Sequence, residues 1–436
     1  MKVLKFGTSA LATSKKFNTV AQLVNSASNS IVILSALAGT TGKLEEISDY
    51  LYKKNPEGAN EGINILEQEY SNKINEIYNS EHIKSEAASF VKEKISYIRS
   101  FTKDLFTLFE EKIVLAQGEI LSSGLFVLKL KEQGVNVQEL SALDFMRIDK
   151  KNEPDSTFIR ENLNRLLKDT AKADIYVTQG YICRNAYGEV DNFHFGGSDY
   201  TAALTGAAVQ SEEIQIWTDI DVLYGKNSNL TSNSQTVHHI NFDEAAELAY
   251  FGAKILHPMC ILPAKMGNIP VRLMSIDAPT SKGTLISNET EKGKIKAVAS
   301  KDGIFAINIK SSRMLLAHGF LRRVTEIFEK HQTSIDMLTT SEVGVSITID
   351  NSKYLTEITD DLKKLGIVTV EQNMTIISVV GDLSPSVNNP IDKVLDAVKT
   401  MPIKMISYGG SSCNISFIIK AEDKEETLQS LNKNIF

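Results

Sequence analysis

Short apolar runs alternate with longer amphipathic stretches over the first three hundred residues of the chain. The apolar runs are typical of β-strands, and the stretches between them repeat apolar residues at the spacing of a helix that buries one face. The predicted strands lie at residues 2–6, 31–35, 173–182, 214–219 and 269–275. This alternation predicts an α/β domain with a largely parallel sheet.

One region of this part departs from the alternation. Residues 61–109 contain almost no glycine or proline, and Glu, Lys, Ile, Leu and Tyr recur there at helical spacing. We interpret this region as a helical insertion. The polar stretch at residues 286–297 is then expected to be a linker to the rest of the chain.

The chain beyond the linker repeats one pattern twice. Each repeat reads strand, helix, strand, strand, helix, and the opening strands begin near residues 304 and 374. Two such units predict two small α+β domains of the ferredoxin-like type. Two unrelated halves of a single domain are the alternative.

Composition narrows the class of protein. The 436 residues are 42% hydrophobic and 23% charged, which indicates a folded chain of two to four domains. A net charge of -7 does not indicate the basic surface that binds nucleic acid, and it favours a protein that acts on small molecules. The three cysteines (Cys183, Cys260 and Cys413) are odd in number and too far apart in the sequence for a metal-ligand cluster, which indicates reduced thiols in the cytoplasm. With no apolar run near the ~20 residues of a membrane span, we expect a soluble, cytoplasmic protein.

The clearest candidate for ligand chemistry is the glycine pair Gly196 and Gly197. It follows a strand-like run and precedes a helix that is expected to start at Ser198 or Asp199. Glycines let a backbone approach a ligand closely, and a helix start presents unpaired N–H groups that suit phosphate. A tight turn in which Ser198 or Asp199 is an ordinary N-cap is the alternative.

Three other predicted strands also end in small or polar residues. Lys5 is followed by a glycine and two hydroxyl residues at 7–9, and two further strands lead to threonines at 40–41 and to Thr-Asp at 218–219. Ligands of α/β proteins bind at the carboxyl ends of strands. The four strand ends therefore predict one shared crevice.

Taken together, these motifs identify a known family. They lie at residues 5–9, 34–41, 118–123, 178–182, 196–204, 217–224, 242–258 and 334–342. With them the chain resembles aspartate kinases of the amino-acid kinase superfamily that carry two C-terminal ACT regulatory units, the lysine-sensitive type most of all.

The resemblance implies a fold and an activity. It implies a three-layer α/β/α kinase domain over residues 1–290, with the helical insertion at about 60–115. Two ferredoxin-like ACT domains would follow at 299–372 and 373–436, either separate or interleaved. The implied reaction is ATP-dependent phosphorylation of L-aspartate to 4-phospho-L-aspartate, the first step toward lysine, threonine and methionine. Feedback by an amino acid such as lysine, and a homodimer or higher oligomer through the ACT domains, are also implied.

The resemblance further implies roles for individual residues. Lys5 would bridge the transferred phosphoryl group, and Asp199 would organise the cations around it. Thr41, Glu119 and Ser198 would contact aspartate, with Glu119 facing its ammonium group. The residues implied on the nucleotide side are Gly7, Ser9, Gly196, Gly197, Thr218, Asp219, Tyr224 and Lys254. Mg²⁺ would be held mainly through ATP phosphates and water, without a protein metal site.

The chemistry of the acceptor agrees with this assignment. An aspartate side chain has a pKa of about 3.9, so at neutral pH it is already a nucleophile and needs no general base. A loose phosphoryl-transfer transition state needs cations and backbone donors in fixed places. A catalytic histidine is therefore not expected.

The first ACT repeat carries the implied effector site. Gly319 precedes a helix whose N–H groups suit a carboxylate, and Asp336 on a nearby strand suits a distal ammonium group. Lys404 occupies the equivalent position in the second repeat, which is therefore not expected to bind a cation in this way. The implied effector residues are Met314, His318, Gly319, Phe320, Leu321, Ser334, Asp336 and Thr340.

The sequence departs from the family pattern at three places. Phe195 replaces the arginine that grips the α-carboxylate of aspartate, Thr8 replaces a glycine, and the basic run after the nucleotide strand is reduced to Lys226. Three hypotheses follow from these changes. Arg184 or Arg272 compensates, or the pocket takes another carboxylate substrate, or the chain is a weak or inactive regulatory homologue.

Overall fold

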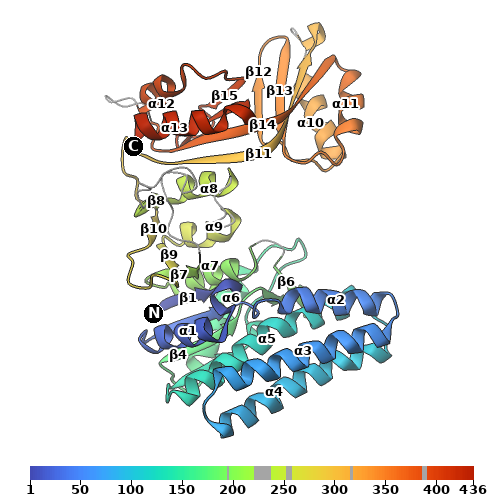
Figure 1. Cartoon of the computed structure of the whole chain (residues 1–436), viewed down its shortest axis with the longest axis vertical. Coiled ribbons are helices and arrows are strands. Elements are labelled where there is room, and N and C mark those ends of the chain that lie inside the picture. Colours follow the sequence, from blue (N-terminus) through green and yellow to red (C-terminus); the bar gives the residue numbers. More distant parts are fainter. Residues whose placement is uncertain (194–195, 220–236, 252–257, 315–317, 385–389) are drawn as a thin grey trace. The chain divides into compact units, whose positions relative to one another are not determined.

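The chain forms two compact units in this computed structural model. The structure describes residues 1–193, 196–219, 237–251, 258–314, 318–384 and 390–436 (Figure 1). The first unit comprises residues 1–222 with 256–288, and the second comprises 223–255 with 289–436. We describe each unit by itself.

The first unit is built on a largely parallel sheet, as the sequence predicts. Its strands are β1 (Lys2–Phe6), β2 (Ser30–Leu34), β3 (Val137–Leu140), β4 (Ile175–Gln179), β7 (Ile214–Thr218), β9 (Val271–Ser275) and β10 (Thr284–Ser287), in the order β3-β4-β2-β1-β7-β9-β10. Only β10 runs antiparallel to its neighbour β9 among these pairings. The carboxyl ends of β1, β2, β4 and β7 therefore meet at one edge. A small ribbon pairs β5 (Ile182–Arg184) with β6 (Val190–Asn192).

Helices cover both faces of this sheet. They are α1 (Ser14–Asn25), α2 (Thr40–Tyr52), α3 (Pro56–Ile77), α4 (Glu81–Ser100), α5 (Leu108–Glu132), α6 (Ser156–Asp169), α7 (Gly197–Val209) and α9 (Pro258–Met266). Helix α5 packs against β2, β3 and β4, whereas α7 packs against β1, β2 and β7. The predicted helical insertion consists of α3 and α4, which lie alongside α5 (Figure 1). The three-layer α/β/α fold is thus confirmed.

Helix α5 corrects one expectation from the sequence. Within the described part of the chain it is the one helix that is long and apolar enough to cross a membrane by length and composition. Most of that apolar stretch is buried inside the protein, where it forms a large part of the core. An apolar run of this length therefore exists, and it is a core helix of the first unit.

The second unit contains an antiparallel sheet of the order β12-β13-β11-β14-β16-β15. Its strands are β11 (Ile295–Lys310), β12 (Met337–Thr340), β13 (Gly344–Ile349), β14 (Ile367–Gly381), β15 (Met405–Tyr408) and β16 (Asn414–Lys420). Its helices are α8 (Phe242–Tyr250), which follows the short β8 (His239–Asn241), and α10 (Phe320–Lys330), α11 (Leu355–Lys363), α12 (Pro390–Val398) and α13 (Lys424–Ile435). Helix α8 belongs to this unit, in which it packs against β11 and β14.

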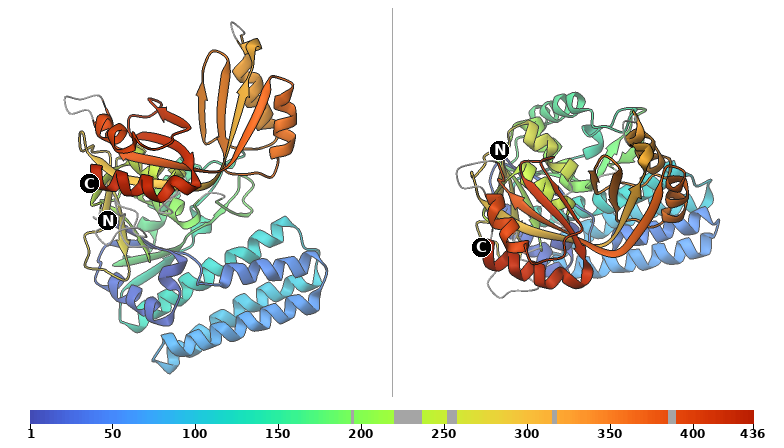
Figure 2. Two further views of the ribbon diagram at one scale, coloured as in Figure 1. Left: turned by 45° about the horizontal axis from the view of Figure 1, so that its top comes forward. Right: turned by 90° about the horizontal axis from the view of Figure 1, so that it is seen from above.

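Two long strands join the two repeats. The first part of β11 pairs with the last part of β14, and after an irregularity near residues 301–304 the rest of β11 pairs with the first part of β14 (Figure 2). Separate cores form at the two ends, around Phe328 in the first half and Phe417 in the second. The stretch predicted as a linker is strand at both ends, because β10 ends at Ser287 and β11 begins at Ile295.

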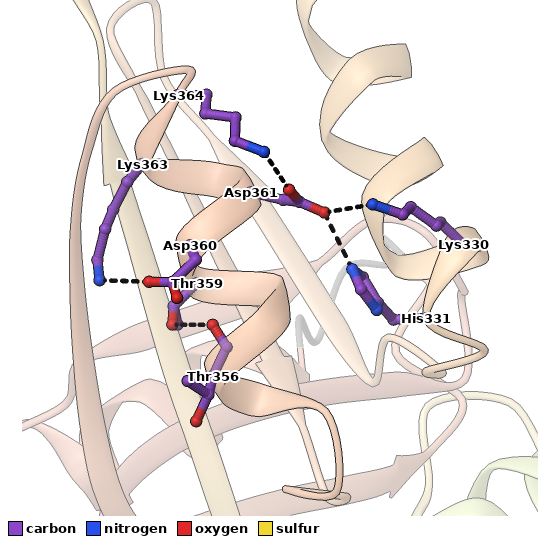
Figure 3. Close-up of polar contacts among 8 residues, drawn as sticks. All are labelled: Lys330, His331, Thr356, Thr359, Asp360, Asp361, Lys363 and Lys364. Carbon is purple, nitrogen blue, oxygen red and sulfur yellow. Dashed lines mark hydrogen bonds and ion pairs between the residues drawn. The ribbon is translucent and has the colours of Figure 1, made fainter.

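A charge cluster on the surface connects the two helices of the first half. Asp361 on α11 accepts hydrogen bonds from Lys330 at 2.8 Å and from the His331 ring at 3.0 Å, both near the end of α10 (Figure 3). Lys364 donates a third hydrogen bond to Asp361, at 2.5 Å. These donors hold the pKa of Asp361 well below its ordinary value. The cluster thus joins α10 to α11 outside their shared apolar core.

Candidate active site

The structure brings Lys5 and Asp199 together at the carboxyl edge of the first sheet. Lys5 is near the end of β1 and Asp199 is in the first turn of α7, and the Lys5 Nζ lies 2.6 Å from the Asp199 Oδ1. A Cβ atom added at Gly7 would lie 3.1 Å from that Nζ, so glycine leaves room for the ammonium group. Their side chains are 10% and 20% exposed, so the pair is largely buried.

The glycine pair forms the start of α7. Gly196 is the N-cap with a φ of 61°, and Gly197 has a φ of 44°, which are left-handed values that favour glycine. The helix begins at Gly197, so the expected start at Ser198 or Asp199 is wrong by one or two residues. The cap makes no side-chain hydrogen bond, which also rules out Ser198 or Asp199 as an ordinary N-cap. The N–H groups of this first turn therefore suit an anion.

Residues at two strand ends contact the first turn of α7 at Ser198. The hydroxyls of Ser198 and Ser35, which follows β2, share a hydrogen bond of 2.7 Å. At the end of β4, a Cβ atom added at Gly180 would lie 2.3 Å from the Ser198 Cβ, so only glycine permits this approach. Ser35 lies inside a motif that the sequence analysis recognised, but its contact with Ser198 was not predicted.

Glu119 supplies a buried carboxylate near the carboxyl end of β2. It lies on α5, is 6% exposed, and accepts a hydrogen bond of 3.3 Å from the Ala36 N–H. Burial raises the pKa of Glu119 to about 8, and the Ala36 N–H opposes that rise. Thr41, the second residue of α2, is half-buried. The residue before it, Thr40, is buried, and its hydroxyl shares a hydrogen bond with the Tyr70 hydroxyl. Tyr70 comes from the helical insertion, and no sequence signal pointed to it.

The predicted nucleotide side is described in part. Thr218 at the end of β7 donates to Asp219 at 3.3 Å, and a hydrogen bond from Ser9 keeps the pKa of Asp219 low. The Gly7 N–H donates to the Trp217 carbonyl at 3.4 Å, which ties the turn after β1 to β7. Tyr224, Lys254, Phe195 and Lys226 lie outside the described residues.

Both arginines proposed to replace the family arginine have other partners in the first unit. Arg184 donates from Nε to the Leu143 carbonyl at 2.9 Å and from Nη1 to the Gly188 carbonyl at 2.6 Å. Arg272 pairs with Glu213 at 2.8 Å and also donates to the Lys282 carbonyl. Both guanidinium groups are held by these partners, so compensation by either of them has no support in this structure.

The predicted effector carboxylate, Asp336 in the second unit, already has partners. Its side chain is 2% exposed, and its Oδ1 lies 2.8 Å from the Lys301 Nζ. The Tyr250 hydroxyl of α8 donates to the same oxygen at 3.1 Å. Lys301 also pairs with Asp350 at 2.9 Å and lies 4.9 Å from the Tyr250 ring centre. The chain itself therefore supplies a lysine ammonium group to Asp336.

The remaining effector residues surround the first half of the second unit. Gly319 caps α10 with a φ of 77°, and Phe320 is buried in the core. The other predicted positions are half-buried (Met314) or exposed (His318, Leu321, Ser334 and Thr340). Asp336 and Lys404 do occupy equivalent places, because each donates its N–H across to the next strand, at 2.9 Å to Thr348 and 2.8 Å to Ile418. Lys404 pairs instead with Glu371.

Comparison with known proteins agrees with this architecture. Residues 1–275 match the amino acid kinase family, and residues 377–435 match an ACT domain family. The chain is 32% identical to lysine-sensitive aspartokinase 3 of Escherichia coli, with 100% of this chain and 99% of the relative covered. It is 31% identical to the chloroplastic aspartokinase 3 of Arabidopsis thaliana, with 100% of this chain and 81% of the relative covered.

Solved structures give the same result. The crystal structure of E. coli aspartokinase III with aspartate and ADP superposes with a TM-score of 0.79 at 30% identity, and 100% of each chain is covered. The same enzyme with lysine and aspartate gives a TM-score of 0.82, with 100% of this chain and 99% of that chain covered. The chain thus belongs to the aspartokinases of the amino acid kinase family, phosphotransferases whose acceptor is a carboxyl group.

Proposed function

We propose that this chain transfers the γ-phosphoryl group of ATP to the side-chain carboxylate of L-aspartate in the cytoplasm, at the start of lysine, threonine and methionine synthesis. The observation that carries the proposal is the Lys5–Asp199 pair, which stands beside the Gly196–Gly197 turn at the carboxyl ends of the strands. The E. coli enzyme crystallised with aspartate and ADP, which matches along its whole length, supports the same reaction.

The residues of the crevice fit phosphoryl transfer. Asp199 holds the Lys5 ammonium at the edge of the sheet, where it neutralises charge on the group being transferred. The first-turn N–H groups of α7 receive phosphate oxygens, and Gly7 leaves room for the Lys5 ammonium group beside them. Mg²⁺, carried on the phosphates and water, supplies further charge neutralisation when bound. Since the acceptor carboxylate is ionised at neutral pH, no residue has to remove a proton from it.

The substrate side fits an ammonium group better than an α-carboxylate. Glu119 offers a buried carboxylate that accepts from backbone N–H groups, Ala36 among them, and Thr41 and Ser198 offer hydroxyls. An ammonium group beside Glu119 would favour its ionised form and hold the substrate in one orientation. No arginine corresponding to the family residue is found at position 195, where the chain has phenylalanine.

A second candidate function follows from the contacts of the two arginines. Because Arg184 and Arg272 are held by other groups, the pocket suits a carboxylic acid that lacks a charged α-carboxylate. Such a substrate would keep the ammonium group for Glu119 and the reacting carboxylate for Lys5. The enzyme would then be an amino-acid kinase with altered acceptor specificity.

Trapping of the acyl phosphate by hydroxylamine distinguishes these functions. The panel contains L-aspartate, its α-amide, β-alanine and succinate, each with MgATP and with the Lys5→Ala chain as control. Aspartate kinase activity predicts hydroxamate from L-aspartate above all, and none in the control. Preference for the α-amide or β-alanine would support the second candidate. Absence of hydroxamate with every acid would overturn both and leave a regulatory homologue.

We further propose that lysine inhibits the enzyme at the first half of the second unit and that the chain forms a homodimer or higher oligomer through its ACT domains. The lysine-sensitive relative and its structure with bound lysine support the effector. The edge strands β12 and β15 expose Leu338, Ile406 and Tyr408, which supports association at this sheet. Light scattering with and without lysine tests the oligomer directly.

A further inference from the structure

Tyr70 is a buried polar residue that the proposed reaction leaves without a role. It lies on α3 in the helical insertion, is 1% exposed, and its hydroxyl is 3.0 Å from the Thr40 Oγ1. Thr40 is itself 2% exposed and is the first residue of α2, next to Thr41. Burial raises the pKa of Tyr70, so its phenol stays protonated and keeps a hydrogen to share with Thr40.

The start of α2 depends on contacts from other elements. Its N-cap is Gly39, with a φ of 84° and no side-chain hydrogen bond to the first turn. A helix start without such a cap leaves its first residues less firmly fixed. The Tyr70 hydroxyl therefore holds the first residue of α2 from outside the helix. One turn further along, Lys43 of α2 pairs with Glu69 of α3, so the two helices are joined at adjacent positions.

The same helix start packs against α5 at Gly118, the residue before the buried carboxylate of Glu119. A Cβ atom added at Gly118 would lie 3.1 Å from the Ala36 Cβ and 3.5 Å from the Thr40 Cγ2, so α5 approaches α2 closely at this glycine. The next residue, Glu119, accepts its hydrogen bond from the Ala36 N–H. Thr40, Ala36 and Glu119 thus form one packed group, and a shift of Thr40 would be felt at the carboxylate.

We propose that Tyr70 is a positioning residue for the amino-acid acceptor, acting through Thr40 on Thr41 and Glu119. This inference rests on the proposed function and extends it, since it assigns a part of the acceptor site to the helical insertion. Tyr70 is buried behind Thr40 and touches no reacting atom. Its removal affects how well the acceptor is held and leaves the phosphate side, built on Lys5 and α7, as it is.

A matched pair of variants tests the assignment. Tyr70→Phe removes the hydroxyl that meets Thr40. Tyr78→Phe removes a hydroxyl that is equally buried at the end of the same helix and donates to the Leu125 carbonyl at 2.5 Å. Both variants should lose similar thermal stability. Only Tyr70→Phe should raise the KM for the acceptor, by about five- to tenfold, the range expected for one buried hydrogen bond, with kcat and the KM for MgATP within about twofold.

A double-mutant cycle shows whether the effect passes through Thr40. Tyr70→Phe should raise the KM no further in a chain that already carries Thr40→Val, because the coupled hydroxyls are both gone. Additive effects would overturn the relay, and equal KM values in Tyr70→Phe and Tyr78→Phe would overturn the positioning role. In either case, hydroxamate formation by the unaltered chain would still support the proposed function. A lack of hydroxamate from the unaltered chain with every acid would overturn both proposals.

Discussion

Two lysine–aspartate pairs of similar length occur in very different surroundings. In the first unit Lys5 meets Asp199 at 2.6 Å, and in the second Lys301 meets Asp336 at 2.8 Å. Lys5 faces a glycine turn and a helix start that suit an anion. Lys301 is shared between two carboxylates and covered by the Tyr250 ring.

The difference shows why a charged pair alone does not define a site. The Lys5–Asp199 pair lies at the first turn of α7 and its carboxylate is 20% exposed, so in the proposed reaction an incoming phosphate would add to the pair. The Asp336 carboxylate is nearly fully buried, so an effector ammonium has to share it with Lys301. Under the proposed function, the first pair receives a ligand as it stands, whereas the second has to be rearranged by one.

The largest expected effect comes from the pair in the first unit. Lys5→Met removes the cation at the transferred group and should lower kcat on the order of a thousandfold, as the loss of a preorganised charge contact does. A coupled assay of ADP release measures kcat in this variant and in the parent.

Lys129→Met is the matched control for this change. Lys129 forms another buried pair in the first unit, 2.7 Å from Glu132, at the far end of α5. The Lys129→Met variant should lose stability and keep kcat within about threefold of the parent, since the substitution removes a buried ion pair away from the reacting groups. Equal losses of kcat in the two variants would mean that the Lys5 effect is one of folding.

The second prediction concerns the pair in the second unit. Asp336→Ala should shift the lysine concentration for half-inhibition upward by roughly a hundredfold, because a buried charge partner is removed. Activity without lysine should stay near that of the parent. Asp350→Ala is the control, since it removes only the more exposed partner of Lys301 and should shift inhibition little. Unchanged inhibition in Asp336→Ala would place the effector elsewhere.

The sequence was sufficient to predict the frame of both regions. Strand periodicity located β1, β2, β4 and β7, and their parallel order brings Lys5, Ser35, Gly180 and Asp219 to one edge. Such features are local, because the period of apolar residues and the glycines at strand ends determine them. The succession of strands and helices along each of the two repeats follows from the same alternation.

Contacts between distant elements could not be read in this way. Tyr70 and Thr40 are 30 residues apart, and Lys301 and Asp336 are 35 apart, with no local pattern that links either pair. The hydrogen bond from Arg184 to the Leu143 carbonyl, 41 residues away, has no local sequence signal either, and compensation by Arg184 stays a hypothesis without support from this contact. Tertiary packing determined all three.

The smallest predicted effect compares two buried carboxylates, Asp336 and Glu119. Asp336 has its cation from the chain, whereas the partners of Glu119 in the described residues are backbone N–H groups, Ala36 among them, and we propose that its cation comes from the substrate. Burial raises the pKa of Glu119 to about 8, so in the free enzyme this group is mostly neutral at pH 7 and ionises as the pH rises. The substrate ammonium binds the ionised form, and its own charge persists over this range.

The KM for the amino-acid acceptor should therefore fall as the pH increases from 7 to 8.5, by about eightfold for a single group of this pKa. The KM for MgATP should show no such slope, because its site lies on the side of Lys5. Glu119→Gln should have a high acceptor KM that no longer depends on pH. A parent KM that rises with pH would show that the neutral carboxyl binds the acceptor, and the contrast with Asp336 would then disappear.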